Sequence, residues 1–305
     1  MATTLPYSNF KQHLIAAFGE ALHRVPVDAG FGCPNRGADG TGGCAFCAED
    51  GGRAHQTRGA ASLEDQIRAG VEFAQRRYGA RRFLAYVQAF TGTFASVEAQ
   101  RAVYDRILAA HPFDALSIGT RPDCLPEPTL ALLEELGRRL PVWVELGVQT
   151  VHDATLRRVN RGHDWDCSRR AILALHGRGL RVAAHVILGL PGETAEHFRA
   201  TAAALAALPL AAIKIHNLHV IRGTALARDY AERPFPVMDE REYAPVVIDF
   251  LRRLPPALPI MRLCTDTPAR ELVAPRWALS KTQFLALVER EMKRNGWQQG
   301  DLARG

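Results

Sequence analysis

The sequence is poor in cysteine and has no long hydrophobic run. Six cysteines among 305 residues are too few, and too unevenly spaced, for the disulfide framework of a small secreted protein. The N-terminal stretch MATTLPYSNFKQ has no basic region followed by an apolar core, so we expect no signal peptide. The longest apolar run, Ala202 to Ile213, is interrupted by Pro209 and is too short to cross a bilayer. We therefore expect a soluble, cytoplasmic protein without a membrane segment.

Acidic residues are outnumbered by basic ones. The chain has 38 Lys and Arg against 32 Asp and Glu, a formal net charge of +6 and a pI near 9.2. A positive chain can bind an anionic partner such as nucleic acid, because Lys and Arg contact phosphates. The arginines occur in pairs at 76–77, 81–82, 157–158, 169–170 and 252–253. Such pairs are also typical of solvated helix faces, so the charge alone leaves this partner open.

One loop organises the chain, the stretch GFGCPNRGADGTGGCAFC from Gly30 to Cys47, here called the cysteine loop. Its thiols, Cys33, Cys44 and Cys47, are separated by ten and then two residues. Thiolates are natural ligands of iron–sulfur clusters and of zinc, and glycines let a short backbone wrap such a group. Three ligands would leave one iron of a four-iron cluster free to bind a small molecule, as a catalytic zinc keeps an open position.

The cysteines alone leave a second interpretation open, a zinc site with a distant fourth ligand. That ligand would come from one of the other cysteines, Cys124, Cys167 or Cys264.

Short apolar strands alternate with amphipathic helices along most of the chain. We expect strands at 83–89, 115–118, 142–146, 182–188 and 212–216, and helices near 62–78, 96–110, 127–138, 166–177 and 194–207. This alternation indicates a parallel sheet covered by helices. An extended stretch at 21–27, before the cysteine loop, brings the pattern to six units. Six is short of the eight of a closed barrel. We therefore predict an α/β fold with a partial (β/α)6 TIM-like barrel; a flatter doubly wound sheet is the alternative.

The pattern changes after about Gly223. Prolines interrupt it between residues 234 and 259, and further helices are expected at 240–253 and 280–293. We interpret residues 1–225 as the barrel and residues 226–305 as a short C-terminal extension packed on it.

Polar residues stand at the predicted carboxyl ends of the strands, where parallel α/β proteins gather their ligand sites. Glu145 lies inside the apolar strand VEL, where a carboxylate is costly to bury without partners. It is suited to accept hydrogen bonds from a ribose diol. His185, Lys214 and His216 lie in the next two strands, and their type and position fit a core role as well as a functional one.

Further motifs are VDAGF at 27–31 before CPNR, GTRPD at 119–123, VELGVQT at 144–150, RVNRGH at 158–163, LGLPGE at 188–193, and KIH followed by VIRGT between 214 and 224. Together with the cysteines, these motifs resemble those of the radical S-adenosylmethionine (SAM) superfamily. The resemblance is closer to its branch with the YhcC-like proteins and the catalytic subunit of Elongator. It extends over nearly the whole chain, from about Tyr7 to Trp277.

The resemblance implies a [4Fe–4S] cluster on Cys33, Cys44 and Cys47, with SAM on the fourth iron. It also implies contacts to SAM from Glu145, Gln149, Arg161, Gln88, Thr91, Thr93 and Arg121. The segment 88–93 replaces the glycine-rich motif that usually follows the second strand, which weakens the assignments of Thr91 and Thr93. The implied reaction uses one electron, from a donor such as flavodoxin or ferredoxin, to cleave SAM to a 5′-deoxyadenosyl radical that abstracts hydrogen from a substrate.

The substrate is the least determined part of this interpretation. The Elongator enzyme acts on the wobble uridine of transfer RNA, so the resemblance makes transfer RNA the leading candidate substrate and partner. A small molecule or a protein stays open as substrate. So do two other classes, a cluster-bearing redox sensor or accessory protein without radical chemistry and a zinc-dependent RNA-binding module. The substrate-side candidates are His185, Lys214 and His216.

Overall fold

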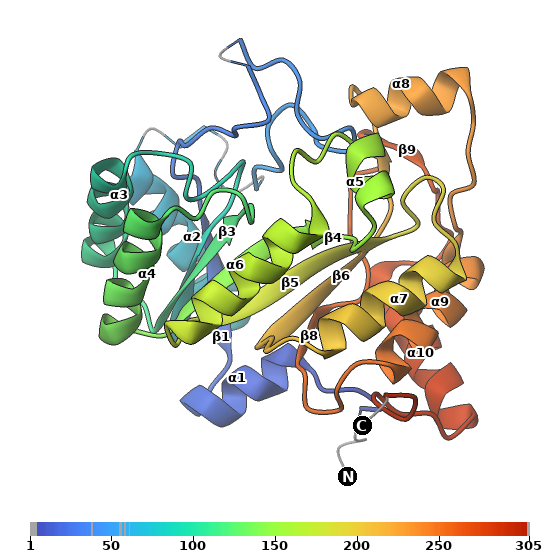
Figure 1. The fold of residues 1–305 in the computed structure, drawn as a ribbon. Coiled ribbons are helices and arrows are strands. Elements are labelled where there is room, and N and C mark those ends of the chain that lie inside the picture. Colours follow the sequence, from blue (N-terminus) through green and yellow to red (C-terminus); the bar gives the residue numbers. More distant parts are fainter. Residues whose placement is uncertain (1–4, 38, 55–56, 58, 61, 304–305) are drawn as a thin grey trace.

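The computed structural model describes residues 5–37, 39–54, 57, 59–60 and 62–303. Within these residues seven parallel strands form one sheet, in the order β1-β2-β3-β4-β5-β6-β8, which curves into a half-barrel (Figure 1). The strands are β1 (Leu22–Val27), β2 (Arg82–Val87), β3 (Ala115–Thr120), β4 (Val142–Gln149), β5 (Arg181–Leu188), β6 (Ala212–Asn217) and β8 (Ile260–Arg262). The predicted α/β partial barrel is confirmed.

Within this sheet, the strand that the sequence did not predict is β8. It pairs in parallel with β6, with Lys214 opposite Arg262. Three residues are shorter than a recognisable strand pattern, and prolines flank the segment at 255–259. The sheet therefore takes its last strand from the segment interpreted as an extension. The division between residues 225 and 226 stays a prediction.

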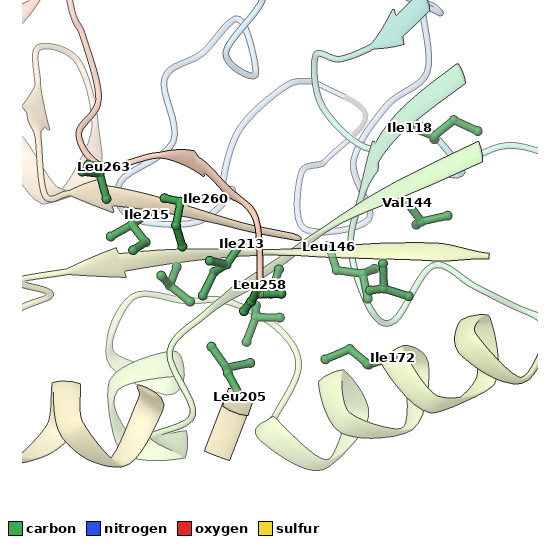
Figure 2. Packing of buried hydrophobic residues seen from close by; sticks show 14 of the residues in the cluster. Ile118, Val144, Leu146, Ile172, Leu205, Ile213, Ile215, Leu258, Ile260 and Leu263 are labelled. Atoms are coloured by element: carbon green, nitrogen blue, oxygen red, sulfur yellow. The ribbon is translucent and has the colours of Figure 1, made fainter. Parts of the chain in front are cut away.

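The helices surround the sheet: most of them cover its outer, convex face, and the first, the fifth and the eighth lie at its two ends (Figure 1). They are α1 (Phe10–Phe18), α2 (Leu63–Tyr78), α3 (Val97–Ala110), α4 (Glu127–Arg139), α5 (Asp153–Arg158), α6 (Trp165–Gly177), α7 (Ala195–Ala206), α8 (Ala225–Glu232), α9 (Glu240–Arg252) and α10 (Lys281–Arg294). Figure 2 shows part of the core between them, where Ile172 of α6 and Leu205 of α7 face strand residues such as Leu146 and Ile213. No helix in the described part of the chain is both long and apolar enough to cross a membrane.

Local sequence explains where these helices begin. Ser62 precedes α2, and its hydroxyl accepts a hydrogen bond from the backbone of Asp65. Asp164 and Ser280 cap α6 and α10 in the same way. Short polar side chains at this position satisfy amide groups that have no partner within the helix.

The concave face of the half-barrel is built in layers. Its lowest layer, here called the apolar layer, consists of Leu22, Leu84, Ala115, Trp143, Ala183 and Ala212. Helix α1 closes this end, with Phe10 and Leu14 packed against the layer.

Two residues further along each strand, toward its carboxyl end, the inward-facing side chains are polar. Alternate residues of a strand face the same side, so the next inward positions follow at i+2. They form a polar layer, which consists of Arg24, Tyr86, Ser117, Glu145, His185 and Lys214. Beyond it the strands end and a cavity opens.

Candidate active site

A cavity of about 930 Å³ lies at the carboxyl ends of the strands, between them and the cysteine loop. Cys33, Cys44 and Cys47 all line it. The other predicted site residues that line it are Gln88, Thr91, Arg121, Glu145, Gln149, Arg161, His185, Lys214 and His216. Thr93 does not, because it is buried behind the wall, where its hydroxyl donates to the carbonyl of Cys124 at 2.6 Å.

The three thiols lie close enough to sense each other's charge. Burial raises the pKa of the Cys47 thiol; the neighbouring Arg36 opposes the increase, and Cys44 and Cys33 add to it. Cys44 is buried, and its sulfur accepts a hydrogen bond from Nη1 of Arg161 at 3.3 Å.

The donor set fits an iron–sulfur cluster better than a single metal ion. Among the described residues no three Cys, His, Asp or Glu side chains converge on one point to hold one ion. A zinc ion needs such convergence, whereas each thiolate of a cluster binds a different iron. The remaining cysteines, Cys124, Cys167 and Cys264, do not line the cavity and offer no fourth ligand there.

The RVNRGH motif fastens the cysteine loop to the barrel. The backbone amide of Ala45 donates to the carbonyl of Val159 at 2.8 Å, and the side chain of Asn160 donates to the carbonyl of Gly43 at 2.9 Å. The side-chain amide of Asn35 donates in return to the carbonyl of Asn160. Gly43 has a φ of 93°, which a residue with a side chain rarely adopts. The motif therefore sets the position of Cys44 relative to the strand ends.

Backbone strain gathers around the cavity. Ala89, Phe90, Gln149 and Asn160 have positive φ values of 89°, 51°, 73° and 51°, uncommon for residues other than glycine. The first two follow β2, Gln149 ends β4, and Asn160 is in the RVNRGH motif. Strained positions of this kind cluster at binding and catalytic sites.

Three buried polar atoms at the cavity have no hydrogen-bond partner among the described residues: Oγ1 of Thr91, Nε of Arg161 and Nε of Arg53. All three side chains line the cavity. An unpaired buried donor costs free energy, and most such groups in native proteins are satisfied. A polar ligand in the cavity would supply the missing partners, so the site fits a bound cofactor as well as a cluster.

Glu145 is the centre of the polar layer. Its Oε1 lies 2.7 Å from Nη1 of Arg24 and accepts a hydrogen bond from Ser117 at 2.7 Å. Its Oε2 lies 2.7 Å from Nε2 of His185 and 3.0 Å from Nζ of Lys214. Burial alone would raise the pKa of Glu145, but Arg24 and Lys214 hold it well below its usual range. The carboxylate is thus ionised and fully partnered within the protein.

Burial also shifts the basic groups around Glu145. It lowers the pKa of His185 to about 4, with Lys214 adding to the effect. It lowers the pKa of Lys214 to about 8, against the opposing attraction of Glu145. Burial and the positive charge of Arg262 hold the pKa of His216 well below its usual range. At neutral pH both histidines are uncharged, and most of Lys214 is protonated.

Three residues at this site were missed by the sequence analysis: Arg24, Tyr86 and Arg262. Arg24 packs over the ring of Tyr86 at 4.6 Å from its centroid, and the Tyr86 hydroxyl accepts a hydrogen bond from Lys214 at 3.1 Å. Tyr86 is an inward-facing polar residue between apolar neighbours, the same signal that identified Glu145, whereas Arg24 stands beside His23 and gives no such signal. Arg262 was missed because its strand was not predicted.

The fold and the cavity together define a class of protein. A parallel half-barrel carries three loop cysteines at the carboxyl ends of its strands. The chain matches the family model of the Radical SAM superfamily over residues 29–205 and that of the Radical_SAM C-terminal domain over residues 210–294.

Full-length relatives define the family further. The chain is 36% identical to YtqA of Bacillus subtilis, over 97% of this chain and 94% of that protein. It is 34% identical to YhcC of Escherichia coli K12, over 97% and 95%. The chain therefore belongs to the radical SAM superfamily, and within it to the family of YhcC and YtqA. It is an enzyme of this superfamily, which implies a [4Fe–4S] cluster and SAM as cofactors.

Two further similarities are partial. The tRNA uridine(34) acetyltransferase of Methanocaldococcus infernus is 29% identical over 62% of this chain and 35% of its own length. The solved structure of Elp3 from M. infernus superimposes with a TM-score of 0.69 at 24% identity, over 77% of this chain and 59% of that one. The second similarity is one of fold.

Proposed function

We propose that Cys33, Cys44 and Cys47 hold the [4Fe–4S] cluster and that SAM binds beside it in the same cavity. The observation that carries the proposal is that these thiols share one cavity with Thr91 and Arg161, whose buried polar atoms lack partners. When bound, such a cluster supplies one electron for the cleavage of SAM to methionine and a 5′-deoxyadenosyl radical, which takes a hydrogen atom from the substrate.

The tasks of the chain are to orient SAM and to keep the site dry. Nε of Arg161 is free to donate to the carboxylate of SAM, and a charge-assisted bond of this kind is strong. The proposed partners of the rest of SAM are Gln88, Thr91, Arg121, Gln149 and, for the ribose, Glu145. Thr93 would support this set only from behind the cavity wall, because its hydroxyl is already bonded there.

For Glu145 to contact the ribose, one of the four groups that now bond to its carboxylate would have to give way. On the substrate side we propose His185, Lys214 and His216. His185 and Lys214 lie next to the apolar layer and α1, which keep water from entering at that end, and His216 lies one layer further toward the cavity.

For the substrate, we retain the wobble uridine of transfer RNA as a proposal. Its support is the partial similarity to an enzyme named tRNA uridine(34) acetyltransferase. The net charge adds little, since four of the five arginine pairs include a residue in an ion pair on the surface, as Arg76 does with Glu72 and Arg170 with Asp166. An electron donor such as flavodoxin or ferredoxin and a cytoplasmic setting complete the proposal.

A small anionic substrate is the second candidate, favoured by the charge of the cavity. Among the described residues that line it, eight are Lys or Arg and four are Asp or Glu.

The test uses protein purified and reconstituted without air, reduced with dithionite and supplied with SAM. We expect 5′-deoxyadenosine in the mass spectrum from the wild type and from Cys167→Ala, whose thiol lies outside the cavity, but not from Cys44→Ala. A brown [4Fe–4S] protein that neither binds nor cleaves SAM would contradict the proposal. Loss of an unmodified uridine from added transfer RNA, measured on digested nucleosides, tests the substrate separately.

A further inference from the structure

The edge of the cavity at β6 and β8 carries an unbalanced positive charge. Arg24, Lys214 and Arg262 all line the cavity there, and one carboxylate, that of Glu145, lies among them. Both oxygens of Glu145 are occupied, one by Arg24 and Ser117 and the other by Lys214 and His185. Arg262 forms no hydrogen bond or ion pair with any residue that the structure describes.

The strand register brings the free groups together. Lys214 of β6 lies opposite Arg262 of β8. His216 lies two residues beyond Lys214 on the same face of β6, also lines the cavity, and has no hydrogen-bond partner among the described residues. Three groups thus lie together. They are Arg262, which has no partner among the described residues, Lys214, which already bonds to Glu145 and Tyr86, and the uncharged imidazole of His216.

The electrostatic effects agree with this geometry. After burial, Arg262 contributes to lowering the pKa of both Lys214 and His216. Lys214 is buried and Arg262 is half-buried, so their like charges repel more strongly than they would in open water. Asp266 and Glu271 also line the cavity; Asp266 is exposed, and Glu271 pairs with Arg270. Neither neutralises the group at β6 and β8.

We propose that Arg262, Lys214 and His216 form a subsite for the anionic group of a small substrate, a carboxylate or a phosphate. The proposal rests on the second candidate of the proposed function, the small anionic substrate, because it places this substrate in the cavity that SAM would share. A uracil base is uncharged at neutral pH and would leave the positive charge unbalanced. The substrate class is therefore a small organic acid or a phosphate ester.

The test measures binding of small anions to the full reconstituted chain without SAM or reductant. Titration calorimetry with inorganic phosphate and with malonate, at matched ionic strength, should show saturable binding. Arg262→Gln should weaken it by at least about tenfold, because the cation of the subsite that has no partner within the protein is lost. Arg262→Lys should retain most of the affinity. Arg290→Gln, the same change at an exposed position of α10 away from the cavity, should leave it unchanged.

The outcomes separate the two kinds of anion and the two proposals. Tighter binding of malonate supports an organic acid, and tighter binding of phosphate supports a phosphate ester. Absence of saturable binding, or equal binding in wild type and Arg262→Gln, would overturn the subsite. The subsite would also be overturned if neither small anion binds and transfer RNA binds equally to the wild type and to Arg262→Gln. The binding titration contains no SAM, so its result can be interpreted even if the enzyme does not cleave SAM.

Discussion

At the scale of single residues, the buried Glu145 determines much of the site's chemistry. Its side chain is inaccessible to solvent, yet the carboxylate is ionised because Arg24 and Lys214 lie against it. Removing one member of such a buried group leaves the others as uncompensated charges. The same carboxylate fixes which way His185 and Lys214 point into the cavity.

Glu145→Gln should therefore be strongly destabilising. We expect the free energy of unfolding to fall by about 3–5 kcal/mol, since Arg24 and Lys214 stay buried without their counterion. Urea unfolding followed by tryptophan fluorescence measures the change. Glu72→Gln breaks an exposed ion pair with Arg76 and should cost at most about 1 kcal/mol. Equal stability of the two variants would show that the charge of Glu145 is not needed.

Gly147 is a second informative residue, because a side chain there would reach Arg161. A Cβ atom would lie 2.5 Å from Nη2 of Arg161 and 2.8 Å from Nε2 of Gln149. Both are ends of flexible side chains, so Gly147→Ala should fold and displace them. We expect SAM affinity to fall by about tenfold, which is about 1.4 kcal/mol. Calorimetric titration of SAM measures the loss, and Gly177→Ala, in open space on α6, should bind normally. Unchanged affinity in Gly147→Ala would argue against the proposed role of Arg161.

At the scale of elements, sequence patterns located almost every strand and helix of the barrel. Apolar strands and periodic helices are long enough here to be recognised, and the cysteine loop has a specific spacing. The pattern did not find β8, whose pairing depends on the neighbouring β6 and not on its own three residues. Nor did it find Arg24, because its role appears only when β1 faces β4 across the concave side. Contacts across the concave face depend on how the whole sheet curves, which the sequence of a single strand does not show.

Helix α1 is the element that closes the apolar end of the half-barrel. Phe10→Ala should lower the free energy of unfolding by about 3–5 kcal/mol, because it leaves a hole beside Trp143. Ile15→Ala changes the solvent side of the same helix, where the side chain is 38% exposed. It should cost no more than about 1 kcal/mol. Urea unfolding of both variants measures the two losses. Similar losses of unfolding free energy would show that the packing of Phe10 against the sheet does not stabilise the protein.

At the scale of the whole molecule, the residues after 225 complete the main core. Phe250 of α9, Phe284 of α10 and Ile260 of β8 all belong to it. A chain that ends at residue 225 should therefore lack cooperative unfolding and expose apolar surface. Calorimetry and dye binding test this. A sharp transition in the shortened chain would support the division into a barrel and an appended extension.

The stability of the molecule should fall on the acid side. Burial lowers the pKa of His219 to about 4. Between pH 6.5 and about 4 the unfolded chain binds a proton that the folded chain excludes, so stability decreases as the pH falls. The slope is at most about 1.4 kcal/mol per pH unit for one histidine. The loss of unfolding free energy between pH 7.5 and pH 5 should be smaller in His219→Gln than in wild type. The same change at the exposed His176 is the control, and identical losses in all three proteins would contradict the prediction.

The two ends of the described chain are joined under the half-barrel. The backbone amide of Ser8 donates to the side chain of Gln299 at 2.9 Å, across 291 residues, and Asn9 forms a bridge with Ile260 of β8. A ribosome adding about 5–20 residues per second makes Gln299 roughly 15–60 s after Ser8. During that time the backbone amide of Ser8 has no partner, while the apolar side of α1 can already pack against the strands made before residue 213. The contact between the two ends is therefore among the last to form on a newly made chain.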